Sequence, residues 1–477
     1  MNFIKRDILQ MDATSIAKEI RNGNLTSLEV TQAYITHIKR ANPSLNTLVE
    51  DRFDEALAEA KEKDAQTGER GALHGVPISI KEAYDVSGMK TTGGLVKWKE
   101  RIRNSDAAVV KKLKQAGAII LGKTNTPELC FCQETDNTLY GRTNNAWDKT
   151  RTAGGSSGGE GALLGVGGAA LGIGSDIGGS IRFPSHFNGV IGFKSGKFQV
   201  SEQGHFPETT EPLQSRMLGL GPMGKSVCDM ELMYNIIAEN SVKEIEDQEI
   251  HDYTIEFLTD NQIYPLTYTT TSILKKVKDF LKGSFSVEQN TPPYFEESAL
   301  LWQEIMSIGG GKSEINVAFP SGQGNVFLEY AKKKVIGKSQ VHPYLSWALI
   351  GARLFKPSHK RQMVIRNILG EGDRRLDGYL NNRLLIFPVY HTAAPKHGKV
   401  YKEIFSIRKT FLKYMPYIAY ANVWGLPALT IPVGTDKNNM PISIQIMSKN
   451  GNESAIIQLG KILEARFRGY IRSTLFD

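Results

Sequence analysis

The chain has 477 residues, of which 40% are apolar and 23% charged, a balance typical of a globular protein. Its formal charge of +8 contains no block of five or more like charges, so an arm for nucleic acid is not indicated, and no run of about 18 apolar residues could span a membrane. Three cysteines are too few for a disulfide framework and the first 15 residues lack the apolar core of a signal peptide, so we expect a cytoplasmic protein.

Helix signals dominate the N-terminal part. Thr26 and Glu29 predict a capping box, in which the Thr26 side chain accepts from a helical N–H while Glu29 reaches back. Apolar residues then recur at the helical spacing, namely Val30, Tyr34 and Ile38. We predict an amphipathic helix over 27–40 and a second helix over 50–64, where Glu, Ala and Lys dominate.

Strand and helix signals alternate further along. Residues 75–81 predict a short buried strand that ends on a lysine, and residues 118–122 predict another. Between them, Ser105 and Asp106 are expected to cap a helix that Gly117 closes. A strand, a helix and a strand at this spacing indicate an α/β fold with parallel pairing.

The later part of the chain returns to the same pattern after a looser middle. The elements expected there are strands over 427–433 and 442–446 and a helix over 453–467. We therefore expect one large α/β domain over 1–477, with a mixed twisted β-sheet covered by helices on both faces. Its core should lie at about 70–235, a variable substrate-pocket region at about 245–415, and the resumed sheet at about 416–470.

A glycine-rich stretch covers residues 154–184 and contains no histidine. Twelve of its 31 residues are glycine, and its serines are Ser156, Ser157, Ser175 and Ser180. A flexible linker is the ordinary interpretation of such a composition. The filler here is Ala, Leu, Val and Ile, so the glycines more plausibly permit close approach inside a folded core.

Several functional motifs fit this chain poorly. Residues 154–158 match the G-x-S-x-G nucleophile elbow, but no hydrophobic strand precedes them. Residues 311–313 carry the end of a phosphate loop, but Met306 stands in place of its first glycine. Cys130 and Cys132 lack a nearby His or further Cys to complete a metal site. We expect neither a metal nor a cofactor.

The segment 176–180 suits acyl transfer. Its two successive glycines let backbone N–H groups point into one small volume, where an oxyanion would develop. The expected donors are Ile177, Gly178, Gly179 and Ser180. Ser180 would be the nucleophile and Lys81 its base, since burial lowers a lysine pKa. Ser156 could pass the proton between them, because a hydroxyl donates and accepts at once.

Three blocks of the chain together resemble the amidase signature family: residues 75–81, 154–159 and 174–182. They occur in the family's order, with the family's separations, and the resemblance covers about 10–235 and 415–470. It implies the amidase signature fold and a serine amidase that hydrolyses carboxylic amide bonds. It also implies a Ser-cisSer-Lys triad, in which Ser180 forms an acyl-enzyme, Ser156 stands on a cis peptide and Lys81 is the base.

Within that family the chain resembles the fatty acid amide hydrolase branch. The resemblance lies in residues 158–165, 176–185 and 394–397, and it implies long-chain acyl amides as substrates. A short-chain or aryl amidase is one alternative. The A subunit of a transfer-RNA amidotransferase, which usually has Thr in place of Ile177, is another. A scaffold protein with a degenerate site is disfavoured because all three triad residues are present.

The acyl pocket can be sketched from the same resemblance. Cys130, Phe131 and Ser157 are expected at the substrate. Aromatic residues of the middle region that could extend an apolar tunnel are Trp302, Phe319, Phe327, Trp347 and Phe355.

A second apolar segment, residues 344–366, bears on whether the protein contacts a membrane. Its apolar first half and basic second half could lie on a membrane surface, although a core helix with a solvated basic end is the alternative. The expected partner is a small-molecule amide, without nucleic acid; peripheral membrane contact and a homodimer are further hypotheses.

The chain also departs from the family's pattern. Ala146 and Ala153 stand where many members have proline, and Ser195-Gly196 replaces a common Pro-Thr. We expect these changes to loosen two loops without affecting the triad.

Overall fold

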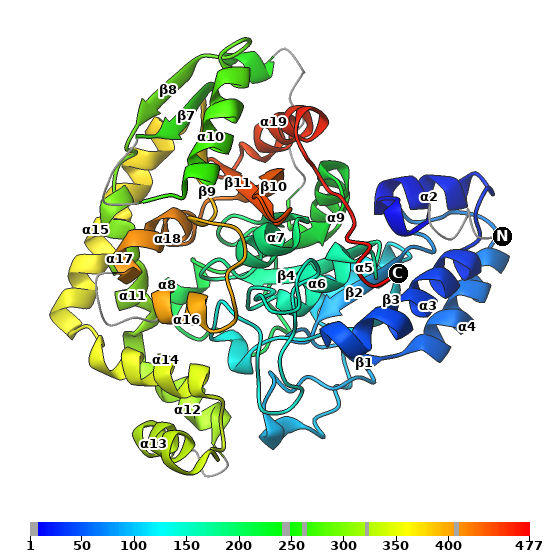
Figure 1. Ribbon diagram of the computed structural model, residues 1–477, viewed down its shortest axis with the longest axis horizontal. Helices are drawn as coiled ribbons and strands as arrows, with labels where there is room; N and C mark the ends of the chain where they lie inside the picture. The colour runs from blue at the N-terminus through cyan, green and yellow to red at the C-terminus, as the bar shows by residue number, and fades with distance from the viewer. Residues whose placement is uncertain (1–7, 241–248, 260–264, 320–323, 405–409) are drawn as a thin grey trace.

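The fold is built around an eleven-stranded mixed β-sheet (Figure 1). This computed structural model describes residues 8–240, 249–259, 265–319, 324–404 and 410–477. The strands lie in the order β1-β3-β2-β4-β6-β5-β10-β11-β9-β7-β8. Their bounds are β1 Leu48–Asp51, β2 Pro77–Lys81, β3 Ile119–Thr124, β4 Leu171–Asp176, β5 Ile191–Lys194, β6 Gly219–Gly224, β7 Thr254–Leu258, β8 Val287–Asn290, β9 Arg383–Pro388, β10 Ala428–Thr435 and β11 Pro441–Met447.

Parallel pairing is found on either side of an antiparallel centre. Strand β2 runs parallel to β3 and β4, and β7 runs parallel to β8 and β9. The other neighbouring strands pair antiparallel. The mixed sheet is therefore confirmed, and the β2–β3 pair is parallel, as the strand-helix-strand pattern predicted.

Helices cover both faces of this sheet. Helices α6 and α7 pack on β2, β4 and β5, while α9 and α19 pack on β6 and β10. The helix bounds are α2 Ala13–Arg21, α3 Ser27–Leu45, α4 Phe53–Ala65, α5 Ala108–Gln115, α6 Gly158–Gly165, α7 Arg182–Asn188, α8 Pro212–Ser215, α9 Val227–Ile237, α10 Tyr268–Leu281, α11 Phe295–Met306, α12 Lys312–Ala318, α13 Val326–Ile336, α14 Pro343–Leu354, α15 His359–Tyr379, α16 Lys399–Ile404, α17 Thr410–Tyr414, α18 Pro416–Val423 and α19 Glu453–Arg466.

The N-terminal predictions hold with one exception. The capping box is formed: Thr26 Oγ1 accepts from Glu29 N at 3.1 Å, and the Thr26 N–H donates to Glu29 Oε2 at 2.9 Å. The helix expected over 50–64 begins only at Phe53, because β1 precedes it and pairs with β3.

The expected cap of α5 is not formed. The helix begins after Ala107, and no side chain caps its first turn. Asp106 instead accepts from Lys114 Nζ at 2.9 Å and from the Ser87 N–H at 2.8 Å. The Asp106 carboxylate, which the sequence pattern predicted to cap α5, thus forms an ion pair with Lys114 instead.

The two loops with alanine in place of proline are not loosened. The Ala146 N–H, which a proline would lack, donates to Asn188 Oδ1 at 3.1 Å. Asn188 Nδ2 in turn donates to the Ala153 carbonyl at 2.8 Å. One buried asparagine from α7 therefore holds both loops.

The middle region, where few element boundaries could be predicted, completes the sheet and adds helices beside it. It contributes β7, β8 and β9 at one edge. Helices α12, α13 and α14 form a group at the lower edge of Figure 1. They enclose a second, smaller apolar cluster that includes Phe319, Leu345 and Leu349.

The central parallel strands position the chemistry. Strands β2 and β4 are neighbours in register, with Ser79 opposite Gly172, and their carboxyl ends carry Lys81 and Asp176. Side chains at the carboxyl ends of adjacent parallel strands meet at one edge of a sheet. Gly172 leaves room there, since a Cβ would overlap with Glu160 Oε1 from α6.

Candidate active site

Lys81 lies at the centre of a buried polar cluster. Its Nζ is 2.6 Å from Ser156 Oγ and 2.9 Å from Ser175 Oγ, so it can donate to both hydroxyls. The Gly155–Ser156 peptide bond is cis. Burial lowers the pKa of Lys81, although Cys130 and two nearby carboxylates act in the opposite direction. A lysine in these surroundings gives up its proton more readily than one in water.

One acidic side chain, Glu160, lies close to this cluster. Glu160 accepts from Ser79 Oγ and from Thr124 Oγ1, the latter at 2.7 Å. Burial raises the pKa of Glu160 to about 7, despite these hydrogen bonds and the charge of Lys81. The sequence offered no signal for Glu160 beyond its place in the glycine-rich stretch.

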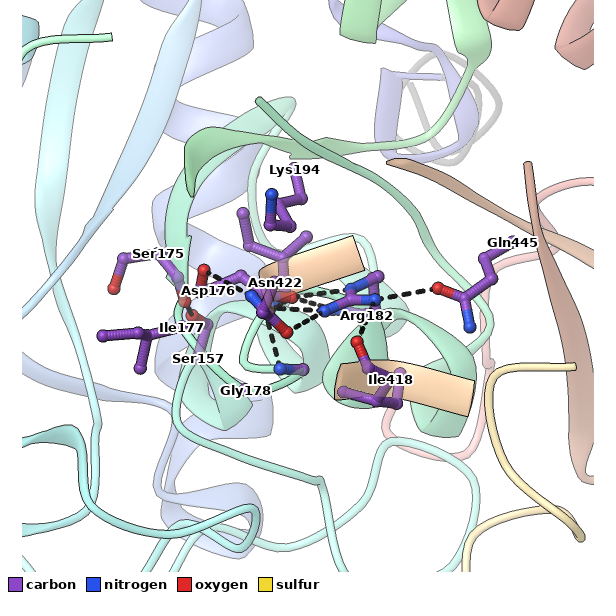
Figure 2. Close-up of polar contacts among 12 residues, drawn as sticks. Ser157, Ser175, Asp176, Ile177, Gly178, Arg182, Lys194, Ile418, Asn422 and Gln445 are labelled. Carbon is purple, nitrogen blue, oxygen red and sulfur yellow. Dashed lines mark hydrogen bonds and ion pairs between the residues drawn. The ribbon is translucent and has the colours of Figure 1, made fainter. Parts of the chain in front are cut away.

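The glycine loop after β4 is held by a fully buried ion pair (Figure 2). Arg182 donates to both carboxylate oxygens of Asp176 at 3.0 Å. Burial alone would raise the pKa of Asp176, but the Arg182 guanidinium and the Asn422 amide hold it well below its usual range. Asp176 is therefore a charged anchor for the loop and not a proton carrier.

The loop leaves three N–H groups of residues 177–180 available. The Gly179 N–H, which we expected among the donors, is taken up by Asp176 Oδ1 at 2.7 Å. Within the described residues, the N–H groups of Ile177, Gly178 and Ser180 have no protein acceptor. The loop therefore offers three free donors in place of four.

A histidine, a residue type that the glycine-rich stretch lacks, lies beside this cluster. His205 Nε2 is 2.9 Å from Ser175 Oγ, and its Nδ1 is 3.2 Å from the Pro207 carbonyl. Since a carbonyl only accepts, Nδ1 carries the proton and Nε2 accepts from the Ser175 hydroxyl. Burial, aided by Lys81, lowers the pKa of His205 to about 3, so the ring is neutral.

These side chains line one pocket with an extended apolar wall. Its lining includes Ser156, Ser175, Ser180 and His205. The apolar wall comes from distant segments, with Cys130, Phe131, Trp302, Met306, Trp347, Ala348, Ile350, Leu354, Phe355, Ile404 and Phe411. The described residues contain no group of three or more His, Cys, Asp or Glu side chains that could hold a metal ion.

Sequence and structural similarity to known proteins identifies the family of this chain. The amidase family profile matches residues 29–285 and 335–457. The chain belongs to the amidase family. It is 32% identical to fatty-acid amide hydrolase 2-B of Danio rerio and 31% identical to fatty-acid amide hydrolase 2 of Homo sapiens; each alignment covers 98% of this chain and 91% of the relative. A solved structure of fatty acid amide hydrolase superposes with a TM-score of 0.81 at 22% identity, covering 97% of this chain and 86% of that one.

The amidase is thus a hydrolase of amide bonds whose fold is the expected one. The structure places Lys81 and Ser156 in contact and puts Ser180 in the same pocket. Cys130 and Phe131 line that pocket as well. Ser157 lies outside the lining: it is fully buried, and its N–H donates to the Ser180 carbonyl at 3.1 Å.

The aromatic residues named from the sequence separate into two groups in this amidase. Trp302, Trp347 and Phe355 line the pocket. Phe319 is buried in the smaller apolar cluster, and Phe327 is 48% exposed on α13. Helical spacing does not show which side of a helix faces a cavity. The sequence alone therefore could not separate the aromatic residues that line the pocket from those that do not.

Proposed function

We propose that this amidase acts through an acyl-enzyme on Ser180, with Ser156 as the bridge and Lys81 as the base. The observation that carries the proposal is the contact of the buried Lys81 with Ser156, which lines the same pocket as Ser180. A buried lysine with a lowered pKa can serve as a general base near neutral pH.

The hydrogen-bond directions prepare Lys81 for this role. The Ser175 hydroxyl donates to His205, so Ser175 can only accept from Lys81. Neutral Lys81 thus uses one N–H on Ser175 and can turn its lone pair toward Ser156 Oγ. Lys81 then takes the Ser156 proton while Ser156 takes the proton of Ser180.

The Ser180 oxygen attacks the carbonyl carbon of the amide, and the electron pair of the C=O bond moves to oxygen. The three free N–H groups of Ile177, Gly178 and Ser180 stabilise this oxyanion. Collapse of the intermediate breaks the C–N bond, and the proton held by Lys81 passes through Ser156 to the leaving amine. Water then releases the acid from the acyl-enzyme by the same steps.

We further propose long-chain acyl amides as substrates. The apolar wall of the pocket and the similarity to two fatty-acid amide hydrolases support this choice. A short-chain or aryl amidase is the alternative if the acyl site is short. An ammonia-donating subunit acting on transfer RNA is less favoured, because Ile177 departs from that branch and no charge block could hold RNA.

Ser180→Ala is expected to reduce turnover of an acyl anilide below about one per cent of the parent and to abolish labelling by a fluorophosphonate, since the nucleophile is removed. The assay uses the purified chain without a partner subunit, ATP or transfer RNA. Ser185→Ala is the matched control, because Ser185 is buried on α7 and its hydroxyl has no partner among the described residues. Retained labelling in Ser180→Ala, or parent activity only with a partner and ATP, contradicts the proposal.

Activity is expected to fall as the pH is lowered through the pKa of Lys81, because the protonated ammonium has no lone pair to accept from Ser156. Lys81→Ala should lose this acid limb together with most of the activity, and Lys81→Arg should not restore it, since Arg stays charged. Glu160→Gln is the control, because burial raises the pKa of Glu160 to about 7 and its own titration can also produce an acid limb. If the acid limb disappears in Glu160→Gln but persists in Lys81→Ala, the limb belongs to Glu160 and the proposed role of Lys81 is contradicted.

Specificity constants are expected to rise along a series of acyl amides from C2 to C16, by up to roughly fourfold per CH₂, until the pocket is full. Gly351→Leu should remove this gain for long chains only, because Gly351 lines the pocket and an added Cβ meets no atom within 4 Å. Gly370→Leu on α15 is the control, with equal space outside the pocket lining. A flat series, or a maximum at C2–C4, indicates a short-chain or aryl amidase.

Peripheral membrane contact is also proposed, at a different helix from the one that the sequence suggested. Within residues 344–366 most apolar side chains of α14 are buried, as in Leu345 and Leu349, and the exposed apolar side chains of this range are Leu354, Met363 and Val364. The neighbouring α13 instead exposes Phe327, Leu328, Val335 and Ile336, and carries three lysines, Lys332–Lys334. No helix within the described residues is both long and apolar enough to cross a bilayer. A homodimer stays a prediction, to be measured by light scattering.

Binding to vesicles with anionic lipid is expected and should weaken as salt is added, because lysines flank the exposed apolar residues. The double substitution Val335→Glu and Ile336→Glu should reduce the fraction that sediments with vesicles. Leu475→Glu, at a residue of similar exposure far from α13 in the chain, is the control. Equal sedimentation of all three proteins removes α13 as the contact.

A further inference from the structure

We infer that Trp302 and Asn422 are positioning residues for the oxyanion-binding N–H groups, each acting through the carbonyl of the same peptide unit. The inference rests on the proposed role of the loop at residues 177–180. In a planar trans peptide the C=O of one residue and the N–H of the next point in opposite directions. A side chain that holds the carbonyl therefore sets the direction of the following N–H.

Trp302 holds the peptide between Ile177 and Gly178. Its indole Nε1–H donates to the Ile177 carbonyl at 2.7 Å, which directs the Gly178 N–H to the opposite side. The ring packs so closely on the loop that a Cβ at Gly178 would lie 2.6 Å from Trp302 Cζ2. The side chain is 92% buried and lines the pocket, so this contact is made where the amide reacts.

Asn422 holds the preceding peptide. Its Nδ2 donates to the Asp176 carbonyl at 3.2 Å, which directs the N–H of Ile177, and it also donates to Asp176 Oδ1 at 2.9 Å (Figure 2). Asn422 is fully buried on α18, and Arg182 donates to its Oδ1. The asparagine is thus fixed by the same ion pair that fixes the loop.

The peptide between Gly178 and Gly179 is also held through its carbonyl, but its N–H already has an acceptor. Gln133 Nε2 donates to the Gly178 carbonyl at 3.0 Å, and the Gly179 N–H on the other side of that peptide donates to Asp176 Oδ1. Three successive carbonyls of the loop are therefore held by side chains from three distant segments. Of these three peptides, only the two held by Trp302 and Asn422 present an N–H without a protein acceptor among the described residues.

A hydrogen bond accepted by a carbonyl also polarises the N–H of the same peptide unit and makes it a stronger donor. Removing the indole donor should thus weaken a transition-state contact more than a ground-state contact. Loss of a whole oxyanion donor costs about 10²–10³ in kcat, so loss of its orientation should cost about tenfold.

The test replaces Trp302 with 3-benzothienylalanine, an isostere in which sulfur takes the place of the indole N–H. Expected are a kcat about tenfold lower, a KM within about twofold, and about tenfold weaker inhibition by a trifluoromethyl ketone. Binding of the product acid should change by less than about twofold. Where the isostere cannot be introduced, Trp302→Phe also removes the indole N–H, and kcat and ketone inhibition are compared with the parent in the same way. Its smaller ring is expected to change KM as well.

Trp98 is the matched control, because its Nε1 also donates to a backbone carbonyl, that of Val317, at 3.1 Å and away from the pocket. The same isostere there should leave kcat and ketone inhibition unchanged. A kcat at Trp302 within about twofold of the parent overturns the inference, as does an equal loss of affinity for ketone and product acid.

Fluorophosphonate labelling of the parent separates this inference from the proposed function. A parent that is labelled at Ser180, with an isostere variant of parental kcat, contradicts only the role of Trp302. A parent that hydrolyses amides but is not labelled at Ser180 overturns both, since no oxyanion then forms at this loop.

Discussion

The buried ion pair between Asp176 and Arg182 is the interaction on which the rest of the site depends. Asp176 ends β4 and Arg182 begins α7, so their contact closes the glycine loop between a strand and a helix. Either charge alone in this interior would cost several kcal/mol, and breaking such a pair typically costs about 3–5 kcal/mol. The loop is therefore held in one shape before any substrate arrives.

The pair also connects the glycine loop to the C-terminal part of the chain. Arg182 donates to the Ile418 carbonyl at 3.0 Å and to Gln445 Oε1 at 2.9 Å, both from the C-terminal part of the chain. Lys194 lies close by, and burial together with the charge of Arg182 lowers its pKa to about 7 (Figure 2). With Lys194 able to lose its charge, the cluster avoids a second permanent buried cation, as expected where desolvation is costly.

Chemistry and specificity come from different parts of the amidase. The proposed reacting groups stand on β2, on the loop before α6 and on the loop after β4, all within the three blocks that resemble the family. Most of the apolar wall comes from α11, α14 and the segment around α16 and α17. The wall of the pocket and the proposed reacting groups thus come from separate parts of the chain. Trp302 is the exception, since it belongs to the wall and also holds the loop.

The sequence by itself determined the α/β class, the parallel β2–β3 pair, most element positions and the residues of the three blocks, because strand alternation, caps and motif spacing are local properties. The tertiary structure decided that Gly179 donates to Asp176, that Ser157 is fully buried outside the pocket lining, and that α13 exposes four apolar side chains while most of those on α14 are buried. It also brought His205, Trp302 and Asn422 to the site. These residues act through hydrogen bonds that span 30 to 246 positions of the chain, and such contacts leave no periodicity or spacing in the sequence.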